Sequence, residues 1–143
     1  MEPGGYNQVS SSRFVGSKDN LPLKSRHDVL SFETEILQKD FEITGPIKIK
    51  LFVSSSAIDT DFTAKLLDIH PSSQNYSNGL ALNITDSIMR CRYRNSYQNP
   101  EFMIPNKIYS IEFELYPTSI LIKKNHKLGL HISSSNWPRF DVN

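Results

Sequence analysis

The stretch that decides the fold is PIKIKLFVSS, residues 46–55, in which apolar and charged side chains alternate. Its apolar set is Ile47, Ile49, Leu51 and Val53, and the residues between them are Lys48, Lys50 and Phe52. Successive side chains of a β-strand point to opposite faces, so a period of two separates a buried face from a solvent face. The stretch therefore predicts a half-buried strand with a charged outer face.

The same kind of pattern recurs along the chain. It is found in DVLSFETEIL (28–37), DFTAKLLDIHP (61–71), SIMRCRYRNS (87–96), KIYSIEFELYP (107–117), TSILIKK (118–124) and HKLGLHISSS (126–135). Clusters of Asn, Ser, Gly and Pro, which favour turns, bound these segments. No stretch of ten or more residues keeps a convincing helical spacing of apolar residues. The pattern predicts an all-β sandwich or barrel, and we expect two packed antiparallel sheets.

The size and charge of the chain limit what it can be. Its 143 residues suit one domain, with an irregular lead-in at residues 1–25 and a folded domain at residues 26–143. The 16 basic and 15 acidic residues give a net charge of +1, which disfavours nucleic acid and anionic membranes as partners. The single cysteine, Cys91, excludes an internal disulfide, and so few cysteines are compatible with a cytoplasmic origin.

Potential metal ligands occur in two groups. Asp59 and Asp61 stand at the start of an expected strand, but a calcium loop needs about six oxygen ligands, so we favour a role in capping a turn. The four histidines are His27, His70, His126 and His131. Their spacing matches no metal-binding motif. The sequence thus predicts neither a metal nor another cofactor.

Three arginines alternate in RCRYR, residues 90–94. In a strand, Arg90, Arg92 and Arg94 would share one face. Such a row can form forked pairs with carboxylates of a partner surface or clamp a phosphate, and it can equally be the solvated outer face of a sheet. The sequence leaves these alternatives open.

The segment HISSSNWPRFDVN, residues 131–143, contains the residue types of a hydrolytic triad. The serine nucleophile of an α/β-hydrolase lies in a G-x-S-x-G motif, which the sequence lacks, and no neighbour would activate these hydroxyls. We therefore expect a structural corner and no catalytic residue. The serines and Asn136 are expected to satisfy backbone groups there. The anchors of the exit are Trp137, Pro138 and Phe140.

Several of these segments together resemble one protein family. The matching motifs are R-x-DVL at residues 26–30, TGP at 44–46, SS followed by DTDF-x-AKL-x-D through Asp68, R-x-RYR at 90–94 and SSS-N-x-P-x-FD-x-N at 133–143. From about Gly16 to Asn143, the chain resembles the C-terminal jelly-roll domain of the X-Pro dipeptidyl-peptidase and cocaine-esterase type (CocE/NonD) of serine hydrolase.

The resemblance implies a fold and a function. The implied fold is an all-β jelly-roll β-sandwich of two antiparallel sheets, galactose-binding-like. The implied whole enzyme carries its Ser, Asp and His triad in an α/β-hydrolase domain with a helical cap, in segments that precede Met1. This chain is then the non-catalytic C-terminal domain, which packs on the α/β-hydrolase and cap domains and helps to shape the substrate pocket.

Two features depart from the pattern of the resembling family. The family's Gly-His-Arg turn is NHK here, at residues 125–127, so a role for an arginine in this turn is in doubt. Family members also continue beyond FD-x-N to a last strand, whereas this sequence ends at Asn143. We therefore expect a domain truncated before its last strand, with an exposed sheet edge through which it forms a homodimer.

The residues expected at the domain interface come from three segments. They are Asp59, Asp61, Arg90, Arg92, Arg94, Trp137, Arg139 and Asp141. Arg139 is expected to pair either with Asp141 or with a carboxylate of the hydrolase domain. The alternative function is that of a free-standing carbohydrate- or ligand-binding sandwich, with Trp137, Tyr76 and Tyr97 as its available aromatic side chains.

Overall fold

The computed structural model of the chain describes residues 19–137 and 139–143. These residues form six strands and two short 3-10 helices. The elements are η1 (Leu21–Ser25), β1 (Val29–Glu33), β2 (Phe41–Val53), β3 (Asp61–His70), β4 (Leu80–Arg90), η2 (Cys91–Tyr93), β5 (Tyr109–Ile122) and β6 (Lys127–Ser133). Neither helix in this part of the chain is long and apolar enough to cross a membrane.

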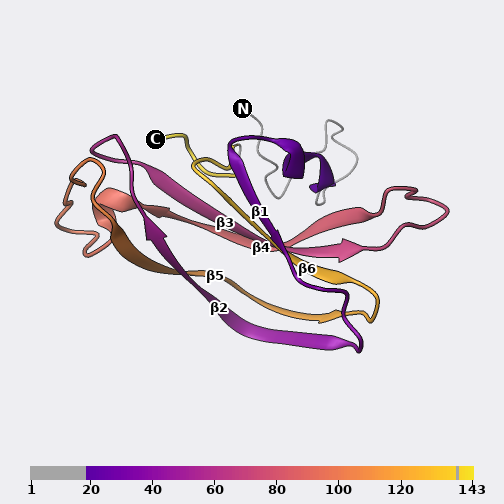
Figure 1. Cartoon of the computed structure of the whole chain (residues 1–143). Helices are drawn as coiled ribbons and strands as arrows, with labels where there is room; N and C mark the ends of the chain where they lie inside the picture. The colour runs from indigo at the N-terminus through magenta and orange to yellow at the C-terminus, as the bar shows by residue number, and fades with distance from the viewer. Residues whose placement is uncertain (1–18, 138) are drawn as a thin grey trace.

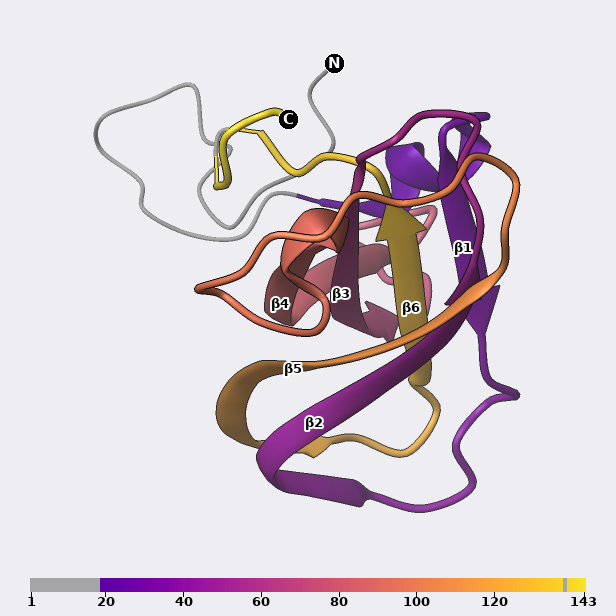
Figure 2. The same cartoon turned by 90° about the vertical axis from the view of Figure 1, so that its left-hand side faces the viewer.

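The strands form two antiparallel sheets that face each other. One sheet has the order β1-β6-β3-β4, and the other consists of β2 and β5. In both views the β2-β5 ribbon crosses beneath the four-stranded sheet (Figures 1 and 2). The expected jelly-roll β-sandwich of two antiparallel sheets is therefore confirmed.

The core lies between the two sheets. From the two-stranded sheet, β2 and β5 contribute Ile49, Val53, Ile111, Phe113 and Leu115. From the four-stranded sheet, Ala64, Met89 and Ile132 face them, and Cys91 and Met103 close one end. Burial alternates along residues 46–53, where Lys48, Lys50 and Phe52 are exposed. The half-buried strand that this stretch predicts is therefore confirmed.

β5 is longer than its sequence pattern indicates. The segments 107–117 and 118–124 predict two strands, but one strand runs through both. Its partner β2 changes register between Gly45 and Ile47, a bulge at which Gly45 adopts a φ of 106°. Pro46 and Pro117 lie at this irregularity, where their missing N–H groups leave no ladder hydrogen bond unmade. The bulge in β2 accommodates Pro117, so β5 continues through this proline as a single strand.

β4 differs from the prediction at both ends. Residues 80–86 extend the strand, because Asn83, Thr85 and Asp86 are buried polar residues that hide its alternation. At the other end, the prediction that RCRYR is a strand is wrong beyond Arg90. Residues 91–93 form η2, a turn that the Arg94 N–H closes by donating to the Cys91 carbonyl at 3.2 Å.

The residues before β1 are ordered where the structure describes them. Residues 21–25, predicted to be irregular, form η1. Just before it, the Asn20 N–H donates to the Ala81 carbonyl at 2.9 Å, and the Ala81 N–H donates to Asp19 Oδ1 at 3.0 Å. This segment is thus docked on β4. The predicted lead-in otherwise falls on residues 1–18, outside the described residues.

Candidate functional site

The predicted interface residues gather at one end of the sandwich. Three long segments meet there: residues 54–60, residues 91–108 and the residues after β6, 134–137 and 139–143. We call this the long-loop end, on the left in Figure 1. Asp61 and Arg90 are the strand residues that border it, at the start of β3 and the end of β4.

Asp61 and Arg90 form a forked ion pair across these two strands. The register places them opposite each other, and Arg90 Nε and Nη2 each donate to one carboxylate oxygen at 3.0 Å. The Asp61 side chain is 1% exposed and the Arg90 side chain 31%. The hydrogen bond from Arg90 to Asp61 raises the pKa of the guanidinium. The pair therefore fixes the strand ends from which the loops leave.

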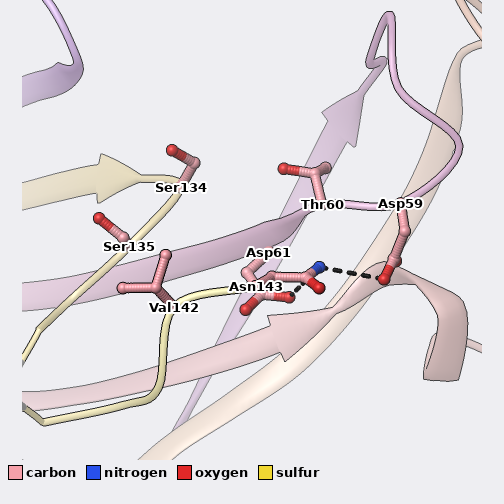
Figure 3. Close-up of a pocket in the computed structure, with 7 residues that line it drawn as sticks. All are labelled: Asp59, Thr60, Asp61, Ser134, Ser135, Val142 and Asn143. Carbon is pink, nitrogen blue, oxygen red and sulfur yellow. Dashed lines mark hydrogen bonds between the residues drawn. The ribbon is translucent and has the colours of Figure 1, made fainter.

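Asp59 holds the neighbouring loop in a similar way. Its Oδ1 accepts the Arg92 backbone N–H at 2.9 Å, and its Oδ2 lies 3.0 Å from Arg92 Nε. The Asn143 amide donates to Asp59 Oδ2 at 3.0 Å and to Asp61 Oδ1 at 3.1 Å, as Figure 3 shows. Asn143 Oδ1 in turn accepts from Arg92 at 3.0 Å. The network thus ties the last described residue to both loops, beside a pocket lined also by Ser134 and Ser135.

Arg94 holds the segment 91–108 to the core. Its guanidinium donates to the Cys91 carbonyl at 3.0 Å and to Glu101 Oε1 at 2.7 Å, and it lies over the Tyr109 ring at 4.6 Å. Its side chain is 4% exposed. The three arginines therefore do not form the row on one strand face that the sequence suggests. Among the described residues, their carboxylate partners are Asp61, Asp59 and Glu101 of the same chain.

The residues after β6 form the expected corner. Ser133 Oγ donates to the Ser135 carbonyl at 2.8 Å, and the Asn136 side chain donates to buried Asp86 at 2.9 Å. Arg139 pairs with the same Asp86 at 3.5 Å, a partner that the sequence did not suggest. Trp137 is half exposed. The anchor expected at Pro138 lies outside the described residues.

Asp141, another predicted interface residue, is exposed. It lines a shallow pocket with Tyr93 and Tyr97, next to the end of β4. Its side chain is thus available to a neighbouring surface.

Exposed apolar side chains lie at the long-loop end, and of these the sequence pointed only to Tyr97 and Trp137. They are Ile58, Tyr97, Phe102, Ile104, Ile108, Trp137 and Val142, with exposures between 48% and 83%. Their signal in the sequence is weak, because they stand singly between polar residues in segments without periodicity. Contiguous patches of exposed apolar side chains are typical of interaction sites.

Ser133, His131 and Cys91 are the side chains near this end whose types could serve as a nucleophile or a base. The Ser133 hydroxyl lies 2.7 Å from Thr63 Oγ1. Burial lowers the pKa of His131 to about 4, and burial raises the pKa of the Cys91 thiol to about 11. Near neutral pH the Cys91 thiol is therefore protonated, and His131 is a neutral, weakly basic imidazole.

The fold is thus a β-sandwich whose long-loop end carries ion pairs and exposed apolar side chains. Residues 4–143 match the family model of the X-Pro dipeptidyl-peptidase C-terminal non-catalytic domain. The chain belongs to this family.

Named relatives agree with this assignment. Cocaine esterase of Rhodococcus sp. (strain MB1 Bresler) is 41% identical over 128 residues, which are 90% of this chain and 21% of the esterase. Among solved structures, an α-amino acid ester hydrolase matches with a TM-score of 0.80 at 29% identity, over 87% of this chain and 21% of the hydrolase. An aminopeptidase from the marine sediment archaeon Thaumarchaeota archaeon matches with a TM-score of 0.86 at 25% identity, over 99% of this chain and 25% of the aminopeptidase. The chain thus spans about a fifth to a quarter of their length, and the resemblance to hydrolases of the CocE/NonD type is confirmed.

Proposed function

We propose that this chain is the C-terminal domain of a serine hydrolase that cleaves an ester, an amide or an X-Pro peptide bond. In this proposal the long-loop end packs on the α/β-hydrolase and cap domains of the same protein and forms part of the wall of the substrate pocket. The observation that carries the proposal is the group of exposed apolar side chains at that end. Burying such a group against a neighbouring domain is favourable at about 25 cal/mol per Å².

The geometry supports two distinct roles for the predicted interface residues. Asp61 and Arg94 are buried inside this chain, so they position the loops and are not themselves contacts. Trp137 and Asp141 are exposed and would touch the neighbouring domain. In this proposal, buried side chains of this chain hold the long-loop end rigid, and the neighbouring domain covers its outer surface.

The relatives support the enzyme class and leave the substrate open. Their names include a cocaine esterase, an α-amino acid ester hydrolase and an aminopeptidase, so both ester and peptide bonds are represented. A shared sandwich on enzymes with different substrates is expected if the chemistry and most of the pocket reside elsewhere in the protein.

The test uses the full-length protein with three substitutions at the long-loop end, Tyr97→Ser, Ile104→Ser and Trp137→Ser. We expect kcat/KM on its best ester substrate to fall at least tenfold and the thermal midpoint to drop, while the 143-residue chain carrying the same changes unfolds like its parent. The matched control is Phe41→Ser, because Phe41 is 44% exposed at the start of β2, at the end of the strand farthest from the long-loop end. Unchanged activity and stability of the triple variant would overturn the proposal.

The alternative, a free-standing carbohydrate-binding module, has less support. Tyr76 lies in the segment between β3 and β4, at the end of the sandwich opposite Trp137 and Tyr97. Tyr97 is stacked on Tyr93, with ring centroids 6.3 Å apart. The three aromatic side chains therefore do not form one platform for a sugar. Binding of the isolated chain to a glycan array would favour this alternative.

A further inference from the structure

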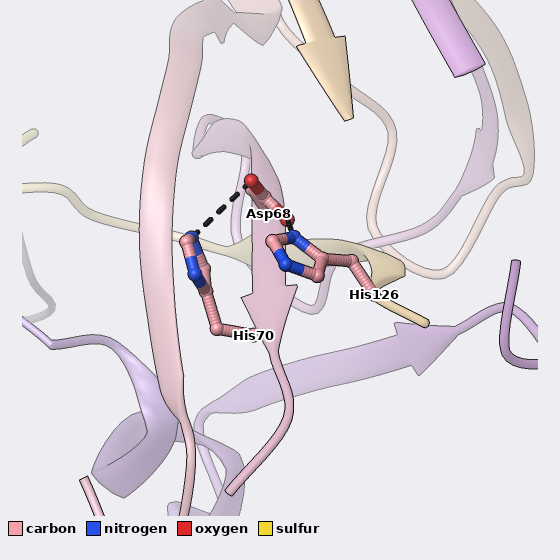
Figure 4. A group of neighbouring side chains, drawn as sticks. All are labelled: Asp68, His70 and His126. Carbon is pink, nitrogen blue, oxygen red and sulfur yellow. Dashed lines mark hydrogen bonds and ion pairs between the residues drawn. The ribbon is translucent and has the colours of Figure 1, made fainter. Parts of the chain in front are cut away.

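Two histidines and an aspartate meet at the end of the sandwich opposite the long-loop end. β3 and β6 pair Ile69 with Lys127, so the next position outward sets His70 against His126. Asp68 lies two residues before His70 and therefore shares its face of β3. Figure 4 shows the two imidazole rings on either side of the Asp68 carboxylate.

The three side chains are close enough to share one ligand. His126 Nδ1 lies 2.7 Å from Asp68 Oδ1, and His70 Nε2 lies 3.3 Å from Asp68 Oδ2. One donor atom from each residue falls within 4.8 Å of the other two. His70 Nε2 is itself buried and makes no hydrogen bond, although its ring is partly exposed. A buried nitrogen without a hydrogen bond is a group whose lone pair or proton calls for a further partner.

The backbone holds these side chains in place. The turn that carries His126 is closed by its N–H donating to the Lys123 carbonyl at 3.1 Å. Leu37 then clamps the turn from outside, since its N–H donates to the His126 carbonyl and its carbonyl accepts from Asn125, both at 2.9 Å. Pairing to β4 and β6 fixes Asp68 on the other side. The donors are therefore preorganised.

We propose that Asp68, His70 and His126 bind a divalent transition-metal ion of the zinc type. Two imidazoles and one carboxylate are a common donor set for Zn²⁺, whereas Ca²⁺ and Mg²⁺ prefer oxygen alone. Ligands at about 2.0–2.1 Å from a tetrahedral ion lie roughly 3.3 Å apart. The distance between His70 Nε2 and Asp68 Oδ2 already matches this value.

Binding requires a small rearrangement on the side of His126. Its 2.7 Å contact with Asp68 is a hydrogen-bond length, and the two ring centroids are 4.2 Å apart, so the His126 ring moves outward as the ion replaces the shared proton. His70 is about a third exposed, which leaves water access for a fourth ligand. The ion joins the end of β3 to the turn that leads into β6, its neighbour in the same sheet.

The test is a titration of the tag-free 143-residue chain with ZnCl₂ by calorimetry, with Co²⁺ absorption as a second readout of tetrahedral nitrogen and oxygen ligation. We expect one equivalent to bind and to raise the thermal midpoint. His70→Gln and Asp68→Asn should each weaken binding at least tenfold. The matched control is His27→Gln, because His27 is an exposed histidine outside the cluster.

The His70→Gln variant decides whether the proposed metal site exists. His70 is the most exposed of the three residues, so His70→Gln should still fold and remain informative if changes at Asp68 or His126 unfold the chain. Wild-type binding no tighter than that of His70→Gln would overturn the site, as would loss of binding in His27→Gln. The measurement uses this chain alone, so its result is independent of the proposed packing on a hydrolase domain.

Discussion

Asp61 and Arg90 lie opposite each other at the adjoining ends of β3 and β4 and share two hydrogen bonds of 3.0 Å. The carboxylate is almost fully buried, and it also accepts the Asn143 amide. One forked pair therefore connects two strand ends and the chain that follows β6. Its integrity decides whether the long-loop end keeps its shape.

Removing the carboxylate should destabilise the domain markedly. We expect Asp61→Ala to lower the free energy of unfolding by about 3 kcal/mol. The change leaves the partly buried guanidinium of Arg90 and the side-chain amide of Asn143 without this acceptor. Urea denaturation measures the change. The matched control is Asp28→Ala, since Asp28 pairs with Arg26 in the same forked geometry but both are about a third exposed. Equal losses in the two variants would contradict the role given to burial.

Protonation of His131 should lower the stability of the domain as the pH falls. Burial lowers the pKa of His131 to about 4, below the ordinary 6.5 that it regains on unfolding. Between these values the unfolded state binds the extra proton, so stability decreases as pH falls from 6.5 to 4, by on the order of 3 kcal/mol from this group. Denaturation curves across this range should show a smaller slope in His131→Gln than in the wild type. An unchanged slope would refute this cause.

Gly79 should tolerate no side chain. Its φ is 81°, and a Cβ atom there would lie 2.5 Å from the His70 carbonyl oxygen. We expect Gly79→Ala to destabilise by more than about 1 kcal/mol. Gly45→Ala is the comparison, because Gly45 also has a positive φ but open space around the added atom. Thermal unfolding should rank Gly79→Ala as the less stable of the two.

Self-association through a sheet edge remains a prediction. Among the described strands β2 and β5 pair only with each other, so each presents an unpaired edge. An edge of this length can add a strand from a second copy, although the lysines of β2 oppose it. Sedimentation velocity from micromolar to millimolar concentration should show a dimer forming. A clean monomer throughout would exclude it.

The fold was predictable where burial follows hydrophobicity. Residues 46–53 alternate in sequence and in burial alike, and the apolar set of residues 109–115 faces the core. The first half of β4 was not predictable, because Thr85 and Asp86 are buried while hydrogen-bonded to Tyr116 and Asn136. Such buried polar residues erase the contrast on which a periodic pattern depends.

The sites depend on contacts that no local pattern contains. The interface residues were predicted from motifs of a resembling family, but the pairing of Arg92 with Asp59 joins segments 33 residues apart. Asp68 and His126 are 58 residues apart, and only the register of β3 with β6 brings them together. Histidine spacing along the chain therefore gave no indication of a metal site.

The mass of the native protein that carries this chain tests most directly whether the chain is one domain of a larger hydrolase. An antibody raised against the purified 143-residue chain can recover it from the cells in which it occurs, for mass determination. If the chain is a hydrolase domain that makes up about a quarter of its protein, as its matches to longer relatives indicate, the recovered mass should be about four times 16.4 kDa. Recovery of a native protein of 16.4 kDa would contradict the account.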